Sequence, residues 1–390
     1  MRSDMMRSNI VRFILVAICL ALRAQSADFS VTLTGQSMIR SDIRAHAPSE
    51  VPILQSLLKG DVIFTNFEAT IVDEKKGQSH LDGRFVSPPE ALAALQSFGF
   101  NLVSFSNNHA WDLKVPGIEN TLEEAKRLNL AHAGTGNNIA EAAAPGYLHT
   151  PKGTVALVAM ASGLIQPGGS ATATRPGVNE LRVENGKPNE EDSKRILQSI
   201  REARKRADLV IVYEHNHVFD KRFETIMLEE LPERLEPPDW LKKWTHAEID
   251  AGADIIVMHG APLLHGVEIY RGRPIFFDLG NFIFQAPPID VLLDEPIVWE
   301  GAVAYVDFQG KKLRSIRFQP IKMNKIGQGQ ADTTDEHTNN LFLQTRGLPT
   351  PAAGEQAHYI IERLADLSRP FGTTIEVHGD TAEVRLKGEN

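Results

Sequence analysis

The sequence predicts an α/β fold in which two β-sheets pack together with helices outside. The first observation is a set of short apolar runs, rich in β-branched and aromatic residues, as expected for strands buried on both faces. They read "FSVTLTG", "DVIFTNF", "NLVSFS", "DLVIVY" and "DIIVM". The second is that helical stretches separate these runs, which is typical of α/β folds. The third is a change after residue 265 to strands joined by short turns, which predicts antiparallel pairing.

The N-terminal segment reads as a secretory signal peptide, residues 1–26, rather than as part of the fold. A short basic region precedes the apolar stretch from Phe13 to Leu22, which is too short to span a bilayer comfortably. Small residues then precede a cleavage site near Ser26. We expect export to a bacterial periplasm or beyond, and the alternative is an uncleaved membrane anchor. Cleavage would remove Cys19, the single cysteine, and with it any disulfide or thiolate metal site.

Four stretches between the apolar runs carry helix signals. "SPPEALAALQSFGF" begins with Ser87 as its cap, has proline in its first turn and ends at Gly99. "VPGIENTLEEAKRLNL" and "EEDSKRILQSIREARKRAD" are amphipathic. "PPDWLKKWTHAEIDAGAD" begins at the capping residue Asp239. We expect a helix in each of the four.

The C-terminal third predicts antiparallel strands and then a small extension. "GVEIYRGRPIFFDLGNFIF" reads as two strands around the "RGRP" turn, and "AVAYVDFQGKKLRSIRFQP" as a hairpin that turns at Gly310. A polar, irregular stretch follows, and the helix "GEQAHYIIERLADLS" and two short strands end the chain. We therefore expect one fold domain over residues 27–322 and a linker with a helix-and-strand extension over 323–390.

The composition and net charge of the chain limit the classes of partner that the protein is expected to bind. Hydrophobic residues make up 42% of the 390 residues and charged residues 23%, as in folded globular proteins. The net charge of -9 disfavours a nucleic-acid binder, which needs a basic face. It does not favour an anionic polymer by long-range attraction either, although a local basic rim could compensate.

Polar side chains follow each of the five apolar runs. In order, they are Gln36; Glu68; Asn107, Asn108 and His109; Glu214, His215 and His217; and His259. Ligands of open α/β sheets bind beyond the carboxyl ends of the strands, so these residues should gather at one edge. Carboxylate, amide and imidazole groups suit zinc, manganese or iron, and the absence of thiolates favours a catalytic over a structural site. The sequence therefore predicts a site for divalent metal or phosphate.

His109 is the candidate proton donor or charge stabiliser, with Asp112 close enough to orient its ring. Each candidate also has a structural alternative. Asn107 and Asn108 could cap the turn before the next helix. His217 and His246 could be surface or helix histidines, and Glu214 could face solvent. Asp278 and Asn281 could be turn residues that hold a strand end.

Several segments in fixed order resemble the CapA family of poly-γ-glutamate capsule-biosynthesis proteins, which are related to the calcineurin-like metallophosphoesterases. The segments are "DVIFTNFEATI", "GFNLVSFSNNHAWD", "DLVIVYEHNH", "AGADIIV" and "PIFFDLGNFIF". The resemblance runs from about Val31 to about Pro320. It implies a four-layer α/β/β/α sandwich of metallophosphoesterase type with a dinuclear metal centre at the strand ends.

The resemblance carries some metal ligands over and loses others. Glu68, Asn108 and His215 fall on ligand positions of the family, and His109 and Asp112 match its His and Asp. Gln36 stands where the family has a ligand Asp. The family's Gly-His-His-Pro-His motif reads "VMHGAPLLHG" here, so its two ligand histidines become Gly260 and Pro262. This leaves room for one metal ion rather than two, with His259, His265 and Gln36 as substitute ligands. The other residues expected to line the site are Asn66, Asn107, His217 and Asn281.

Two functions follow from these features. One is a metal-dependent hydrolase, phosphoesterase-like, connected with capsule or poly-γ-glutamate synthesis, whose substrate is a polyanionic polymer or a phosphoester. Membrane-bound capsule-synthesis machinery would be its partner, and nucleic acid would not. The other is a non-catalytic protein that binds or assembles polymer on a degenerate metallophosphoesterase fold. In the extreme case, the protein binds nothing at the former metal site.

Overall fold

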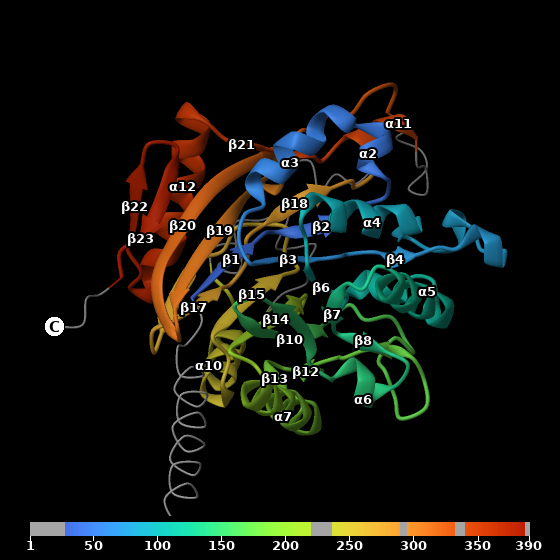
Figure 1. Cartoon of the computed structure of the whole chain (residues 1–390), viewed down its shortest axis with the longest axis horizontal. Helices are drawn as coiled ribbons and strands as arrows, with labels where there is room; N and C mark the ends of the chain where they lie inside the picture. The colour runs from blue at the N-terminus through green and yellow to red at the C-terminus, as the bar shows by residue number, and fades with distance from the viewer. Residues whose placement is uncertain (1–27, 220–235, 289–294, 332–339, 387–390) are drawn as a thin grey trace, which may run out of the picture.

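The computed structural model in Figure 1 describes residues 28–219, 236–288, 295–331 and 340–386. The expected signal peptide and its cleavage site therefore lie outside the described residues. Within the described ranges, no helix is both long and apolar enough to cross a membrane.

The protein has a mixed α/β fold built on two main sheets. The strands of the larger sheet are, in spatial order, β22 (Ile375–His378), β23 (Thr381–Val384), β20 (Lys312–Met323), β19 (Glu300–Gln309), β1 (Phe29–Leu33), β3 (Val62–Asn66), β6 (Leu102–Ser104) and β7 (Ala131–Ala133), with β21 (Pro349–Pro351) beside β20. Those of the smaller sheet are β16 (Val267–Tyr270), β17 (Arg273–Phe276), β15 (Ile255–His259), β14 (Leu209–Asn216), β10 (Gly153–Ser162) and β9 (Gly146–Thr150). All five apolar runs of the sequence form strands.

One hydrophobic core lies between the two sheets. It contains Leu33 and Phe64 from the larger sheet together with Ile211 and Val257 from the smaller one. The rings of Phe64 and Tyr213 meet across this layer, with their centroids 5.4 Å apart. The hydrophobic effect thus holds the sheets face to face.

The parallel strands bring their carboxyl ends to one region. β1, β3 and β6 run parallel in the larger sheet, and β10, β14, β15 and β17 run parallel in the smaller one. Because the sheets pack against each other, the residues that follow these strands can meet across the core.

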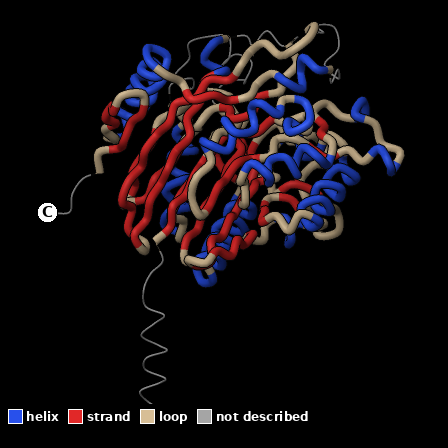
Figure 2. Tube along the Cα trace, turned by 45° about the horizontal axis from the view of Figure 1, so that its top comes forward, coloured by secondary structure: helices blue, strands red, loops and turns tan. Residues whose placement is uncertain are grey.

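Helices cover the outer surfaces of both sheets, and Figure 2 shows helices in blue around the red strands. α4 (Pro89–Phe98) packs its leucines with side chains of β3 and β6. α7 (Glu190–Arg206) and α10 (Asp239–Ala251) pack against β10, β14 and β15. α5 (Lys114–Arg127) follows the candidate residues after β6 and packs beside α4.

The caps of two predicted helices were wrong, although α10 does begin at Asp239. Neither Ser87 nor Asp239 caps its helix, because the residue before the first turn is Pro88 in α4 and Pro238 in α10. α4 does end at Gly99, whose φ of 127° suits glycine and few other residues.

The C-terminal segment continues the larger sheet. β23 pairs with β20, and α12 (Gly354–Ser368) buries Ile360, Ile361 and Leu364 in the core between the sheets. The helix, the two strands and the hairpin around Gly310 lie where the sequence predicts them.

Short elements complete the fold. The strands are β2 (Gln36–Met38), β4 (Thr70–Ile71), β5 (Val86–Ser87), β8 (Thr135–Gly136), β11 (Gly177–Val178), β12 (Val183–Glu184), β13 (Lys187–Pro188) and β18 (Asn281–Phe284). The helices are α2 (Ile43–His46), α3 (Val51–Leu57), α6 (Ile139–Ala142) and α11 (Leu341–Thr345). A 3-10 helix, η4 (Asn108–Trp111), carries part of the candidate site.

Candidate metal centre

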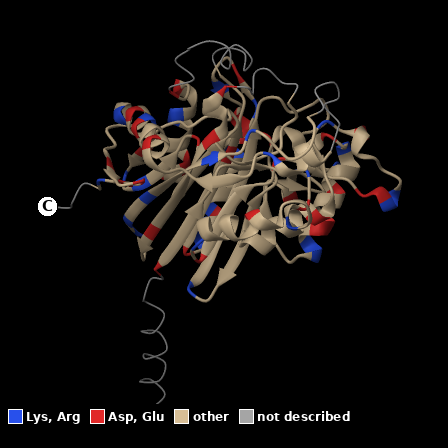
Figure 3. Cartoon of the chain, turned by 90° about the horizontal axis from the view of Figure 1, so that it is seen from above, with Lys and Arg blue, Asp and Glu red and all other residues tan. Residues whose placement is uncertain are grey.

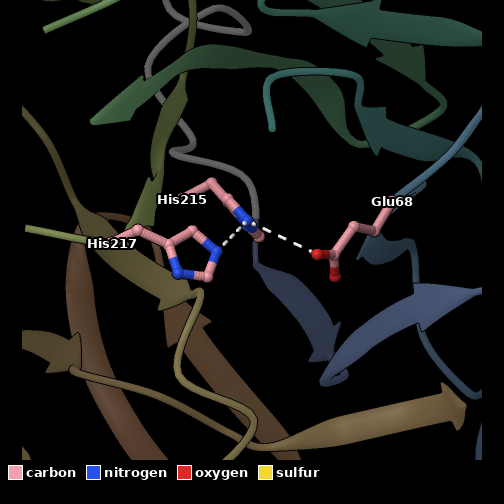
Figure 4. A group of neighbouring side chains, drawn as sticks. All are labelled: Glu68, His215 and His217. Atoms are coloured by element: carbon pink, nitrogen blue, oxygen red, sulfur yellow. Dashed lines mark hydrogen bonds and ion pairs between the residues drawn. The ribbon is translucent and has the colours of Figure 1, made fainter. Parts of the chain in front are cut away.

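Side chains from both sheets converge on the imidazole of His215 (Figure 4). His215 is near the end of β14, and its Nε2 lies 3.5 Å from Oε1 of Glu68, two residues beyond β3. The same Nε2 lies 3.1 Å from Nε2 of His217 and 2.8 Å from Oδ1 of Asn108. Ligand atoms of Glu68, His215 and His217 all lie within 4.8 Å of one another.

This convergence fits a bound cation better than a hydrogen-bond network. A neutral imidazole carries one proton, so Nε2 of His215 can donate to only one of the three atoms that face it. Oε2 of Glu68 is buried and has no hydrogen-bond partner among the described residues. A divalent transition metal would satisfy these lone pairs together, because carboxylate, amide oxygen and imidazole are all suitable ligands.

Burial sets the protonation of the cluster. It raises the pKa of Glu68 well above its usual 4.5, and the nearby charge of Asp112 raises it further. Burial also lowers the pKa of His215 well below 6.5, with the neighbouring histidines adding to the effect, and lowers that of His217 to about 3. Both rings are therefore neutral and ready to bind metal near pH 7, and a cation would favour the ionised form of Glu68.

Neighbouring groups hold the ligands in place. Oη of Tyr213 lies 3.1 Å from Nδ1 of His215, so Nδ1–H can donate to it when Nε2 faces a metal. The Nδ2 group of Asn107 donates to the carbonyl of Phe67 (2.8 Å) and to Oδ1 of Asn66 (3.2 Å). Asn107 is the N-cap residue of η4, as the alternative has it, but its side chain makes no capping bond. Asn107 and Asn66 instead tie the end of β3 to the segment after β6.

His109 lies beside the cluster with a fixed partner. Its Nδ1 is 2.9 Å from Oδ2 of Asp112, and its ring packs against Phe85. Asp112 is held in turn by the backbone N–H of Phe85 (2.6 Å) and by Nε2 of Gln166 (2.9 Å). A carboxylate held by two other donors can orient the imidazole as the sequence predicts.

The remaining candidates contact other groups. His259 directs Nε2 to the carbonyl of Thr34 at 3.1 Å, and burial lowers its pKa to about 3. Gln36 donates from Nε2 to Oδ1 of Asn281 (3.0 Å), and their strands, β2 and β18, pair in parallel. His265 borders a cavity of about 10 Å³, room for about one water molecule.

Among the histidines and carboxylates of the described residues, His259, His265 and Asp278 do not join the three side chains grouped around His215. His259 and Asp278 border the same small cavity as His265. Asp278 does act as a turn residue, because its Oδ1 accepts from the backbone N–H of Gly280. It is also buried, which raises its pKa well above 3.8, and the charge of Glu68 raises it too.

Gly260 has a steric reason to differ from the family motif. Its φ is 135°, and a Cβ added there would lie 2.0 Å from the carbonyl oxygen of Asn216. A histidine at this position would collide with the backbone of Asn216, so the loop after β15 cannot present a side chain here in this conformation.

Two alternatives drawn from the sequence were wrong, the one for Glu214 because β14 is buried on both faces. Glu214 does not face solvent: it is fully buried, and the hydroxyl of Ser162 donates to its Oε1 at 2.9 Å. His217 is neither on a helix nor apart from the site, since it contacts His215 just beyond β14. His246 does lie on a helix, α10. Asp278 is a turn residue, as one alternative predicts, but sequence reasoning missed that it also lies beside His259 and His265, for which its place two residues beyond β17 was the signal.

Comparison with known proteins places these residues within a single family. A family model described as bacterial capsule synthesis protein PGA_cap matches residues 30–286, a range that contains the whole cluster around His215. An uncharacterised protein of Sinorhizobium fredii, y4sH, is 28% identical and is matched over 92% of this chain and 93% of its own length. The PGA biosynthesis protein CapA of Bacillus subtilis is also 28% identical, over 58% of this chain and 53% of its own length. A solved structure of a hypothetical protein from Thermus thermophilus shares 12% identity over 75% of this chain and 98% of its own, but its TM-score of 0.41 supports no conclusion.

Proposed function

The chain belongs to the bacterial capsule synthesis protein family PGA_cap, and from this premise we propose that it is a metal-dependent hydrolase of phosphoesterase type. Its work would be in the synthesis of a capsule polymer, as the description of its family suggests. The single observation that carries the proposal is the convergence of Glu68, Asn108 and His217 on Nε2 of His215.

These four residues would hold one divalent ion of zinc, manganese or iron. When bound, such an ion polarises a phosphoryl oxygen and lowers the pKa of a coordinated water. His109 is placed to give or take a proton beside the cluster, and Asp112 keeps its Nδ1 engaged so that Nε2 is directed elsewhere. The second family site is incomplete, because Gly260 has no side chain and Gln36 is bonded to Asn281.

We further propose a fold type and a cellular location for the protein. The two packed sheets with helices on their outer surfaces would be the four-layer α/β/β/α sandwich of the calcineurin-like metallophosphoesterases. The chain would be exported through its N-terminal segment and would act on a polyanionic polymer or phosphoester beside membrane-bound capsule machinery.

Hydrolysis assays with a matched variant test the enzyme proposal. The purified protein is assayed against a phosphodiester and a phosphomonoester with zinc, manganese or iron added, alongside Glu68→Ala. Hydrolysis by the wild type that falls at least about 100-fold in the variant supports the proposal. Equal rates in both, or no hydrolysis by the wild type with any of the metals, would contradict it.

The loss of ligands at Gly260 and Gln36 favours a second candidate function, that of a non-catalytic protein that binds or assembles polymer. In that case the buried cluster would hold metal only to stabilise the fold. The same assay separates the two, because this candidate predicts bound metal without hydrolysis.

A further inference from the structure

A basic cavity opens at the edge of the sheets opposite to the metal centre. It has a volume of about 930 Å³ and is bordered by the turns after β16, β19 and η7 (Arg369–Phe371). Its basic side chains are Arg271, Arg273, Lys311, Lys312, Arg314 and Arg385. Of the described residues that line it, none is acidic. Figure 3 shows basic residues, in blue, at the ends of the long strands.

Strand directions establish that this edge is remote from the cluster. β17 runs from Arg273 toward Asp278, and it is parallel to β15, which ends at His259. β19 runs antiparallel to β1, so Phe308 pairs with Phe29 at the start of β1. The turns at Arg271 and Lys311 therefore lie where the parallel strands begin, whereas the metal centre lies where they end.

Some basic side chains of the cavity form no ion pair with a described carboxylate, although the whole chain has a net charge of -9. Arg271 pairs with Asp250 at 2.6 Å and Arg273 with Asp254 at 3.0 Å, and Arg385 pairs with Glu376. Lys311 and Arg314 are exposed, and no described carboxylate forms an ion pair with either. A concave surface lined by one sign of charge concentrates the opposite charge locally.

We propose that this cavity binds a polycarboxylate chain. Exposed ammonium and guanidinium groups attract a single carboxylate only weakly, because water and salt screen each contact. A chain that repeats carboxylates can engage several cations at once, and each further contact then forms at high effective concentration. The apolar side chains of Leu313 and Phe371, which also line the cavity, would contact the methylene groups of such a chain.

The choice of a polycarboxylate rests on the proposed function in capsule synthesis, but the cavity does not depend on the metal centre. It would hold the polymer at one edge of the molecule while the cluster around His215 acts at the other. It also answers the objection that the net charge raises, since attraction would come from a local patch.

Binding of fluorescently labelled poly-γ-glutamate, measured by anisotropy at low salt, tests the proposal. Lys311→Glu with Arg314→Glu should weaken binding by about tenfold or more. Lys194→Glu with Lys243→Glu, exposed lysines on α7 and α10, is the control with the same change in net charge and should have little effect. Binding should also weaken with added salt and be far weaker for a short glutamate oligomer.

Three outcomes would overturn the proposal. They are no binding by the wild type, equal losses in both double variants, and a cavity variant that binds as well as the wild type. Vesicles containing phosphatidylglycerol are a further probe, and if the protein binds them through Lys311 and Arg314 but does not bind the polymer, the cavity is a membrane-docking surface. Binding at Lys311 and Arg314 does not need the metal centre, so a wild-type protein that binds the polymer but hydrolyses no phosphoester would contradict the metal proposal and leave this one standing.

Discussion

At the residue scale, the candidate site is a set of ligand groups whose buried arrangement is unfavourable without a cation. Oε1 of Glu68 lies 3.5 Å from Nε2 of His215, and Oε2 of Glu68 has no hydrogen-bond partner among the described residues. Burial without full hydrogen bonding destabilises a fold, and functional sites are where proteins tolerate this. The stability of single-residue variants should therefore report on the site even before a substrate is known.

Glu68→Gln should stabilise the metal-free protein at pH 8, by about 1 to 3 kcal/mol, because an amide avoids the burial of a charge. The sign follows from the raised pKa of Glu68. The wild-type protein loses stability as the pH rises from 4.5 toward that raised pKa, and the variant does not. Urea unfolding in the presence of a chelator at pH 5 and pH 8 measures this. A variant that is less stable than the wild type at pH 8 would show that Glu68 is bonded within the fold.

Asp112→Asn should keep its metal but lower kcat by about 10- to 100-fold, because the ring of His109 loses the carboxylate that orients it. His109→Ala should lower kcat by about 10² to 10⁴. The double variant should be little worse than His109→Ala alone, since Asp112 acts through His109. Rate measurements paired with metal analysis check this, and loss of metal from Asp112→Asn would refute the orienting role.

At the element scale, the ends of strands and the loops after them decide which residues meet. In a strand, successive side chains point to opposite faces, so His215 faces the site while Glu214 faces the helices behind the smaller sheet. The loop after β15 is held close to β14, with Gly260 against the backbone of Asn216. Backbone packing, more than side-chain chemistry, thus fixes what this loop can contribute.

Gly260→Ala should lower the free energy of unfolding by about 3 kcal/mol or more, because the new Cβ meets the carbonyl of Asn216 and φ stays positive. Gly272→Ala is the matched control. It also has a positive φ but nothing within 4 Å of the added Cβ, so it should cost only about 1 kcal/mol. Urea unfolding gives both values. Equal losses would mean that the contact at Asn216 does not constrain the loop.

The start of α7 depends on buried Asp192, which pairs with Arg182 at 2.6 Å and Arg195 at 2.7 Å. Burial opposes its ionisation, but the hydrogen bonds from both arginines outweigh this and lower its pKa below 3.8. Asp192→Ala should lower stability at pH 7 by about 2 kcal/mol, less than for a fully buried pair because Arg182 is half exposed.

That difference should be complete above pH 3.8 and disappear as the pH falls through the lowered pKa of Asp192. Glu202→Ala, which removes an exposed pair with Lys205, should change nothing measurable. A pH-independent effect of Asp192→Ala would mean that packing, and not its charge, stabilises the start of α7.

At the scale of the whole molecule, the sequence predicts most of the strands and helices well, but it predicts less well which side chains meet in the fold. Continuous β-branched runs identify β1, β3, β6, β14 and β15, because strands buried on both faces leave that pattern. β10 escapes prediction since its run "VALVAMA" contains alanine and methionine, which favour helices in isolation.

In the candidate site, too, some features can be predicted from the sequence and others cannot. The positions of Glu68 and Asn108 just after their strands, and of His215 near the end of β14, are readable from the chain, and the structure brings them together. That His259 turns to the carbonyl of Thr34, and Gln36 to Asn281, depends on loop paths and on how the sheets stack. Spacing along the chain does not encode either.

The most direct test of the central claim is the metal content of the purified protein, measured together with a zinc and manganese titration of its Tm. We predict about one ion per chain for the wild type and a rise in Tm on titration, since a ligand that binds only the folded state stabilises it. Glu68→Gln should lose both, while His246→Ala, a histidine on α10 outside the cluster, should keep both. A wild-type protein that holds no metal and shows no shift in Tm with either ion would contradict the account.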